Sequence, residues 1–316
     1  MALTFPWTHR HLLGLEQLTA AEIVSLLDHA NSFLPSCKDP GAKRTDLAGK
    51  SVVNLFFENS TRTRVSFGLA ARRLGAEVID FAVGGSSVSK GETFVDTARN
   101  IEALGIHMVV VRHSCPGTPH LLAQHLRAGV VNAGDGAHEH PTQALLDALT
   151  IRQGFGLTQD LAGLKVLIVG DIRHSRVARS NILLLNLLGA KVTVAGPESL
   201  IPEGIAAMGA QVSHSFEEAL ASKPDVVMML RVQKERMQGE FFSSPADYSK
   251  AWSLEGDRLA MVGTKSLIMH PGPMNRGFEI SSKAADDPRS QVLKQVANGV
   301  AIRMAVLYRC LSGESL

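Results

Sequence analysis

The sequence predicts an α/β protein built from two doubly wound parallel-sheet domains that are joined by helices. Apolar, β-branched segments alternate with segments whose apolar residues recur at helical spacing, which is typical of βαβ units. Several strand segments, such as VLIV at 166–169, are apolar throughout, as expected for a parallel sheet covered on both faces. A break at 154–163, GFGLTQDLAG, separates two such alternating blocks.

The first block contains short apolar segments that we predict to be strands, at 51–57, 76–81, 107–112 and 129–132. Segments with helical spacing precede, separate and follow them, at 20–34, 62–74, 92–104, 118–127 and 140–153. Gly75 directly follows one of these helices and is a typical helix end. Gly134 and Gly136 indicate a tight loop after the strand that ends near Asn132.

The second block repeats the alternation, with predicted strands at 165–169, 191–195, 225–230 and 266–269 and helices at 175–188, 215–221 and 290–313. We therefore place a first domain at 1–149 and a second domain at 150–289. We expect the C-terminal helix, within 290–316, to pack back on the first domain.

Composition excludes several classes of function. The chain has 316 residues, of which 45% are apolar and 20% are charged, so it is expected to fold around real cores. Its net charge is only +2, with two Trp and two Tyr, which predicts no nucleic-acid binding by bulk attraction or base stacking. The longest apolar run is too short to span a bilayer, and the first residues lack a signal-peptide pattern. We expect no membrane contact and a cytoplasmic location.

The cysteines and histidines do not form a recognisable metal-site or disulfide pattern. Cys37, Cys115 and Cys310 lie far apart, which indicates a reducing compartment. His138 and His140 are two residues apart, but no H-E-x-x-H motif or Cys/His cluster accompanies them. We predict neither a metal nor a cofactor.

The run STRTR at 60–64 stands between a predicted strand and a predicted helix. The first N–H groups of a helix lack internal partners, so these groups, the hydroxyls and the guanidinium groups together favour a phosphate site. A capped surface helix with exposed arginines would show the same residues. The run is not a Walker loop, because no G-x-x-x-x-G-K-[ST] occurs in the chain.

Further candidate residues of the first block follow other strands. Arg112 ends the strand in HMVVVRHS, and ligands of open α/β sheets bind outside the carboxyl ends of strands. His140 stands immediately before Pro141 at the start of a helix, where a neutral imidazole can donate a hydrogen bond to a carbonyl oxygen. The loop GGSSVSKGE at 84–92 is either a plain surface loop or an arm that brings Ser86 and Lys90 to an anion.

The second block places arginines at comparable strand ends. VGDIRHSR at 169–176 has no G-x-G-x-x-G pattern, so it only weakly suggests a dinucleotide, and its arginines favour an anion. A second arginine-rich segment, MMLRVQKERM at 228–237, ends another strand and suits carboxylate binding. The turn HPGP at 270–273 follows a strand and is made rigid by its prolines. Because no acid–base pair or catalytic Cys is apparent, these features favour group transfer by positioning and charge stabilisation.

These motifs, taken together, resemble the transcarbamoylases. The resemblance runs from about residue 50 to 305 and rests on five motifs: STRTR (60–64), KGET (90–93), RH (112–113), HPTQ (140–143) and RVQKER (231–236). RVQKER and HPGP point to the aspartate branch, and the His-Cys-Leu-Pro and Ser-Met-Gly elements of the ornithine branch are absent from the sequence. The resemblance implies transfer of a carbamoyl group from carbamoyl phosphate to L-aspartate, in pyrimidine biosynthesis.

The resemblance also implies a role for each matching residue. Carbamoyl phosphate would contact Ser60, Thr61, Arg62, Thr63, Ser86, Arg112, His140, Gln143, Gly272 and Pro273. Thr63, Arg112 and His140 would polarise its carbonyl group, and the backbone carbonyls of Gly272 and Pro273 would meet its amide. L-Aspartate would contact Lys90, Arg176, Arg231 and Gln233. The catalytic set implied is Arg62, Thr63, Lys90, Arg112 and His140.

The resemblance further implies a homotrimer in which Ser86 and Lys90 complete the active site of a neighbouring subunit. Residues 274–279, MNRGFE, differ from the shorter form of members that pair with a regulatory chain, and point to association with a dihydroorotase or an inactive dihydroorotase-like chain. Three other readings remain open on the residues alone: a different amino acid such as ornithine as acceptor, a non-catalytic phosphometabolite sensor, and a nicotinamide dehydrogenase.

Overall fold

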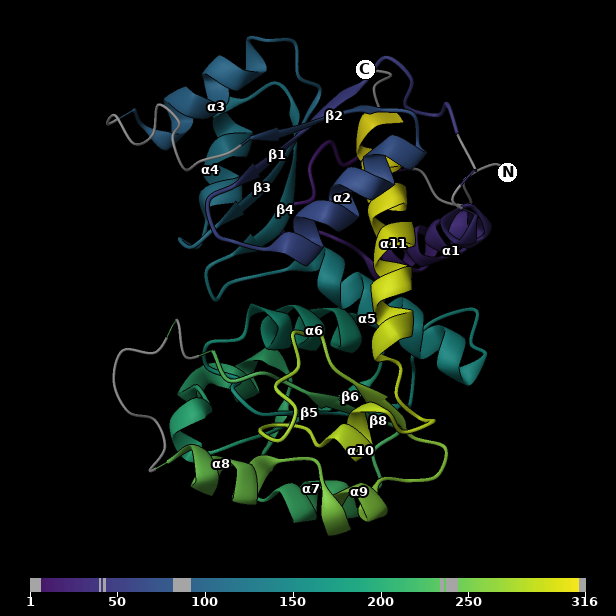
Figure 1. Cartoon of the computed structure of the whole chain (residues 1–316), viewed down its shortest axis with the longest axis vertical. Coiled ribbons are helices and arrows are strands. Elements are labelled where there is room, and N and C mark those ends of the chain that lie inside the picture. Colours follow the sequence, from purple (N-terminus) through teal and green to yellow (C-terminus); the bar gives the residue numbers. More distant parts are fainter. Residues whose placement is uncertain are drawn as a thin grey trace. The chain divides into compact units, whose positions relative to one another are not determined.

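The chain folds into two units, each built on its own parallel sheet (Figure 1). A computed structural model describes residues 7–39, 41, 44–81, 92–233, 236 and 244–312. The first unit comprises Met1–Leu146 and Ala297–Leu316, and the second comprises Asp147–Val296. The chain passes from one unit to the other within α5 (Pro141–Phe155) and again within α11 (Val292–Ser312), so each of these helices has residues in both units.

The sheet of the first unit consists of β1 (Ser51–Phe56), β2 (Glu77–Phe81), β3 (Met108–His113) and β4 (Gly129–Asp135). All its pairings are parallel, in the order β2-β1-β3-β4. The chain therefore moves outward from β1 to β2 and then returns to the other side of β1 for β3. This reversal makes the β1–β3 edge the topological switch point, where open α/β sheets bind ligands.

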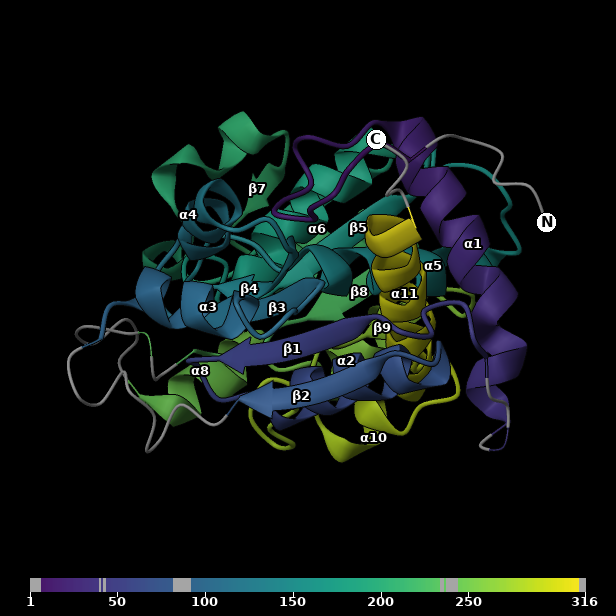
Figure 2. The same ribbon diagram turned by 90° about the horizontal axis from the view of Figure 1, so that it is seen from above.

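Helices cover both faces of this sheet. Figures 1 and 2 show α3 (Phe94–Glu102) and α4 (Thr118–His125) on one face, and α1 (Ala20–Lys38), α2 (Thr61–Arg73) and α11 on the other. Val53, Val109, Val111 and Val130 form the core between the strands and the α3–α4 layer, with Leu122 of α4 packed against them. The C-terminal helix is fastened within this unit, because Arg303 Nη1 donates to Ser66 Oγ at 3.1 Å.

The sheet of the second unit consists of β5 (Lys165–Val169), β6 (Lys191–Ala195), β7 (Gln211–Ser213), β8 (Val226–Met229) and β9 (Leu267–Met269). Its strands are parallel in the order β7-β6-β5-β8-β9, which puts the switch point between β5 and β8. Figure 1 shows α6 (Arg176–Leu187) on one face and α7 (Phe216–Ala221), α8 (Pro245–Trp252) and α9 (Gly256–Met261) on the other. The α/β class with two doubly wound parallel sheets is thus confirmed.

Several local features differ from the sequence prediction. The short elements β7, α8, α9, α10 (Ser282–Ala285) and the 3-10 helices Glu198–Leu200 and Glu203–Met208 were not predicted, because each is too short for a periodic pattern. Helix α1 continues past Pro35 to Lys38 rather than ending at 34, because a proline near the end of a helix disrupts few backbone hydrogen bonds. Strand β4 runs to Asp135, so Gly134 belongs to the strand and only Gly136 follows it.

Candidate functional site

The N-terminus of α2 lies at the β1–β3 switch point of the first unit. Ser60 is the N-cap residue, yet its side chain makes no capping hydrogen bond. Thr61 and Arg62 are exposed, whereas Thr63 is buried. The first turn of a helix of this length presents N–H groups and a positive dipole end, both of which favour an anion. The local geometry therefore suits the phosphate site expected from STRTR.

Arg112 stands on the other side of the same switch point, paired in register with Phe56 of β1. Its side chain is 11% exposed and is held at two points. Nη1 donates to Ala133 O at 3.1 Å, and Nη2 donates to Glu58 Oε1 at 2.7 Å. The acidic partner Glu58 was missed in the sequence, although it stands two residues before STRTR. The pair fixes a guanidinium group beside the N-terminus of α2.

His140 stands where β4 gives way to α5 and is 4% exposed. Its carbonyl oxygen accepts the N–H of Gln143, which is also buried, so the two residues share the first turn of the helix. The start of α5 thereby brings an imidazole and an amide to the carboxyl-end edge of the sheet.

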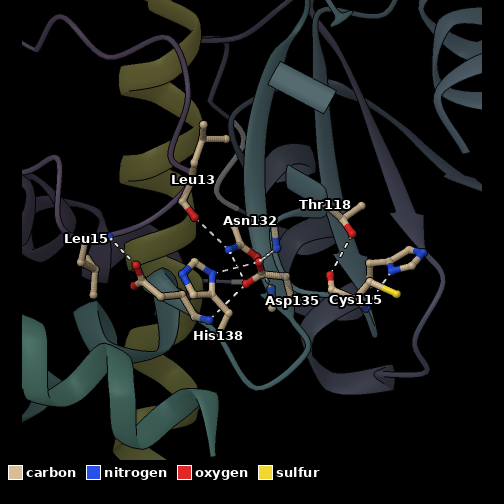
Figure 3. A network of polar contacts seen from close by, with 11 residues as sticks. Leu13, Leu15, Cys115, Thr118, Asn132, Asp135 and His138 are labelled. Atoms are coloured by element: carbon tan, nitrogen blue, oxygen red, sulfur yellow. Dashed lines mark hydrogen bonds and ion pairs between the residues drawn. The ribbon is translucent and has the colours of Figure 1, made fainter. Parts of the chain in front are cut away.

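A buried network around Asp135 shapes the loop that carries His140 (Figure 3). Asp135 is fully buried at the end of β4. Its carboxylate accepts hydrogen bonds from Gly117 N, Asn132 Nδ2, His138 Nδ1 and Glu139 N, at 2.8 to 3.1 Å. Burial alone would raise the pKa of this carboxyl, but the hydrogen bonds from His138, Asn132 and Gly117 outweigh it and lower the pKa.

The same network reaches the N-terminal segment. Asn132 Nδ2 donates to Leu13 O at 2.8 Å, and Glu139 Oε1 accepts the N–H of Leu15 at 3.1 Å. Because these two contacts join segments far apart in sequence, no local pattern could have predicted them. The loop before α5 is thus bonded both to the N-terminal segment and to Gly117, within the first unit.

The second unit presents its polar residues at the β5–β8 switch point. Arg176 is the first residue of α6 and is 3% exposed. Asp171, fully buried after β5, accepts from His174 N at 3.1 Å and from His174 Nδ1 at 2.9 Å. Asp171 also was missed in the sequence, since its role depends on partners across the sheet.

Arg231 and Gln233 follow β8 and lie next to each other. Arg231 Nη2 donates to Gln233 Oε1 at 3.0 Å, and Gln233 N donates to Asp171 Oδ2 at 3.0 Å. The structure thus fastens the segment after β8 to the turn after β5 through one carboxylate. This arrangement gathers arginines at the edge where we expect a carboxylate ligand.

The HPGP turn follows β9 in the same unit. His270 is buried, Gly272 has a φ of +64°, and the Gly272–Pro273 peptide bond is cis. A positive φ favours glycine, which accounts for the residue at 272. Pro273 is exposed. Ser86 and Lys90 lie outside the described residues.

Among the residues that the structure describes, no helix combines the length and apolarity needed to cross a membrane.

Family models match both halves of the chain. The model described as aspartate/ornithine carbamoyltransferase, carbamoyl-P binding domain, matches residues 10–153. The model described as aspartate/ornithine carbamoyltransferase, Asp/Orn binding domain, matches residues 162–310.

Curated relatives and solved structures agree with these matches. The aspartate carbamoyltransferase catalytic subunit of Rhodospirillum rubrum is 54% identical, with 99% of this chain and 97% of that protein covered. That of Clavibacter michiganensis is 53% identical, with 96% and 98% covered.

Two solved structures cover the chain almost completely. The aspartate transcarbamoylase of Trypanosoma cruzi in complex with carbamoyl phosphate and aspartate has a TM-score of 0.85 at 31% identity, covering 96% of this chain and 98% of that one. The catalytic subunit of M. jannaschii aspartate transcarbamoylase has a TM-score of 0.83 at 32% identity, covering 96% and 99%. The chain therefore belongs to the aspartate/ornithine carbamoyltransferase family and is similar along nearly its whole length to aspartate carbamoyltransferase catalytic subunits.

Proposed function

We propose that the protein transfers the carbamoyl group of carbamoyl phosphate to the amino group of L-aspartate, giving N-carbamoyl-L-aspartate and phosphate for pyrimidine biosynthesis. The observation that carries this proposal is that each unit holds a nearly buried arginine at its own topological switch point, Arg112 in the first and Arg176 in the second. Both substrates are anions, so each needs such a charge. The solved relative from Trypanosoma cruzi was crystallised with both of these substrates.

The first unit is proposed to bind carbamoyl phosphate. Ser60, Thr61, Arg62 and Thr63 hold the phosphate at the N-terminus of α2, where the first N–H groups of the helix and its dipole favour an anion. Arg112 and Gln143 add contacts from β3 and α5. Ser86 completes the set, and the backbone carbonyls of Gly272 and Pro273 accept hydrogen bonds from the carbamoyl NH₂ group.

The reaction is proposed to proceed by direct attack of the aspartate amine on the carbamoyl carbon: the C–N bond forms, the bond from this carbon to the phosphate oxygen breaks, and the amine proton leaves with the phosphate. Thr63, Arg112 and His140 polarise the carbonyl and stabilise the oxyanion that develops on its oxygen. Arg62 and Lys90 neutralise charge as the phosphate leaves. An acyl phosphate already carries a good leaving group, so the chemistry assigned to these residues is positioning and charge stabilisation.

The second unit is proposed to bind L-aspartate through its two carboxylates. Arg176 holds the α-carboxylate, and Arg231 with Gln233 holds the side-chain carboxylate. A planar guanidinium group suits such a ligand because it can form two parallel hydrogen bonds. A cationic acceptor such as ornithine would instead require acidic side chains at this place.

We further propose that the protein acts in the cytoplasm as a homotrimer in which Ser86 and Lys90 enter the site of a neighbouring subunit. The form of residues 274–279 supports a larger assembly with a dihydroorotase or an inactive dihydroorotase-like chain.

A panel of acceptors tests the proposed function. Purified protein is incubated with carbamoyl phosphate and, separately, L-aspartate, ornithine and other amino acids, and phosphate release is measured above spontaneous hydrolysis. We expect release with L-aspartate only, with N-carbamoyl-aspartate formed in equal amount. Phosphate release with ornithine would contradict the proposal. So would the finding that no amino acid acts as acceptor.

A further inference from the structure

A histidine–glutamate pair is buried behind the HPGP turn of the second unit. His270 is 1% exposed and Glu279 is 0% exposed. His270 Nδ1 accepts the N–H of Gly272 at 2.8 Å, so this ring nitrogen carries no proton. The proton of the neutral ring is therefore on Nε2, which donates to Glu279 Oε1 at 3.1 Å. The glutamate thus selects the tautomer that can accept from Gly272.

The same carboxylate oxygen also holds the far side of the turn. Glu279 Oε1 accepts the N–H of Asn275 at 2.6 Å. The three residues between these contacts, 272–274, are consequently fixed at both ends by one buried pair. A ligand could reach the turn, because Pro273 is exposed and Gly272 is half-buried.

The pair is in turn anchored to the rest of its unit. The backbone N–H of His270 donates to Gln295 Oε1 at 3.0 Å, and Gln295 Nε2 donates to Asp147 Oδ1 at 2.7 Å. Gln295 and Asp147 are both buried. Breaking any of these links would leave a desolvated group without a partner, and this cost favours the observed arrangement.

We propose that His270, in the tautomer that Glu279 selects, is the positioning residue that sets selectivity for the carbamoyl NH₂ group. This inference rests on the proposed function, in which the carbonyls of Gly272 and Pro273 accept hydrogen bonds from that group. Fixing the N–H of Gly272 fixes the backbone from which both carbonyls project. A site that hydrogen-bonds a substrate NH discriminates against an analogue that lacks it, because its own polar groups then stay unpaired.

Acetyl phosphate provides the analogue, since a methyl group replaces the NH₂ group and the phosphate is unchanged. The measured quantity is the ratio of the dissociation constants of acetyl phosphate and carbamoyl phosphate, obtained by calorimetry without aspartate. A loss of stability or of phosphate contacts weakens both ligands together and leaves this ratio unchanged. A displaced turn weakens the binding of carbamoyl phosphate alone and therefore lowers the ratio.

Two variants separate the contacts of His270. In His270→Asn the side-chain oxygen replaces Nδ1 as acceptor for the Gly272 N–H, and the contact to Glu279 is lost. In His270→Gln the longer amide replaces Nε2 as donor to Glu279, and the acceptor for Gly272 is lost. We expect His270→Gln to lower the ratio about tenfold and His270→Asn to keep it within about twofold. Glu279→Gln, whose oxygen can accept both bonds, serves as the matched control and should also keep the ratio.

The outcomes distinguish this inference from the proposed function. Wild-type protein that does not prefer carbamoyl phosphate over acetyl phosphate overturns the assignment of the turn carbonyls. A wild-type preference that His270→Gln retains in full overturns the positioning role alone. If His270→Gln does not fold, the nitrogen NMR shifts of His270 in the wild-type protein decide the matter: an unprotonated Nδ1 and a protonated Nε2 are expected, and a protonated Nδ1 overturns the inference.

Discussion

The guanidinium group of Arg112 lies 2.7 Å from the carboxylate of Glu58 at the β1–β3 switch point. The arginine proposed to bind the substrate phosphate is thus held by an acid. The pair keeps Arg112 oriented, but the carboxylate offsets part of the positive charge that an incoming anion would meet. We therefore expect Glu58 to limit the affinity of the proposed site for phosphate.

Glu58→Gln should strengthen the binding of inorganic phosphate. The amide oxygen can still accept from Arg112, while the negative charge that opposes a bound anion is removed. We expect roughly fivefold tighter binding by calorimetry, which is about 1 kcal/mol. Glu77→Gln, at an exposed residue of β2, is the control for the change in net charge. Weaker phosphate binding in Glu58→Gln alone would show that the carboxylate supports the ligand instead of opposing it.

Arg62→Ala should lower turnover about 10²- to 10³-fold, because loss of one charged donor at a transition state costs about 3–4 kcal/mol. Arg64→Ala is the matched control, since Arg64 is another exposed arginine of the same helix and has no proposed contact with substrate. Initial rates with both substrates at saturation measure the effect. Near-normal turnover in Arg62→Ala would remove Arg62 from the phosphate site.

Arg231→Ala should weaken L-aspartate binding about 10- to 100-fold, the range for losing a hydrogen bond to a charged group. Binding of carbamoyl phosphate should be almost unchanged, because its proposed phosphate contacts lie in the first unit. Calorimetry with each ligand separates the two effects. Arg258→Ala removes another arginine of the second unit, paired with Glu217, and should affect neither ligand. An equal loss for both ligands in Arg231→Ala would refute the division of the substrates between the units.

Whether the sequence predicts a residue of this site depends on how far apart along the chain that residue and its partners lie. STRTR and His140-Pro141 are local patterns at the ends of predicted strands, so both their positions and the switch-point edge could be inferred from the chain. Glu58 and Asp171 were missed because their importance comes from partners on other segments: Glu58 pairs with Arg112 of β3, and Asp171 accepts from Gln233 N beyond β8. Asp135 was missed although most of its partners are local, because its burial and its bond to Gly117 N depend on the fold. A carboxylate after a strand looks the same in the sequence whether it is solvated or holds a distant backbone.

Short elements show the same limit for the fold. The long helices were predicted because burial of one face imposes a period on them, and the central strands because burial of both faces makes them almost continuously apolar. Helix α9 and strand β7 span only a turn or a few residues, so tertiary packing decides their conformation and no periodic signal exists.

Asp135→Asn should destabilise the first unit and lower turnover. In Asp135→Asn, the amide NH₂ group would face N–H groups that now donate to the carboxylate. We expect this to lower the free energy of unfolding by about 3 kcal/mol. The pKa of Asp135 is lowered in the folded state. Its contribution to the free energy of unfolding is therefore fully present at pH values above its pKa in the unfolded chain, about 4, and is lost as the pH falls through its pKa in the folded protein.

Urea unfolding of wild type and Asp135→Asn from pH 7 downward measures both effects. The gap between the two proteins should be constant near neutrality and should narrow below about pH 4. Asp257→Asn, at an exposed residue of α9, is the control and should match the wild type throughout. A gap that widens as the solution becomes more acidic would contradict the lowered pKa.

Mixed trimers test whether subunits share their active sites. Lys90→Ala and Arg62→Ala proteins should each be nearly inactive, because Lys90 serves the neighbouring site and Arg62 serves its own. When the two variants are dissociated, mixed and reassembled, some interfaces combine an intact Arg62 with an intact Lys90 from next door. Activity should then return, up to about one native site per trimer, because in a ring of heterologous contacts each subunit contributes to two sites.

A site built within a single chain cannot be rescued in this way, since every chain carries one lesion. Reassembly is verified by the mass of trimers that carry one tagged variant. If verified mixed trimers stay inactive, the shared site is refuted, while the transfer chemistry assigned to Arg62 and Arg112 is unaffected.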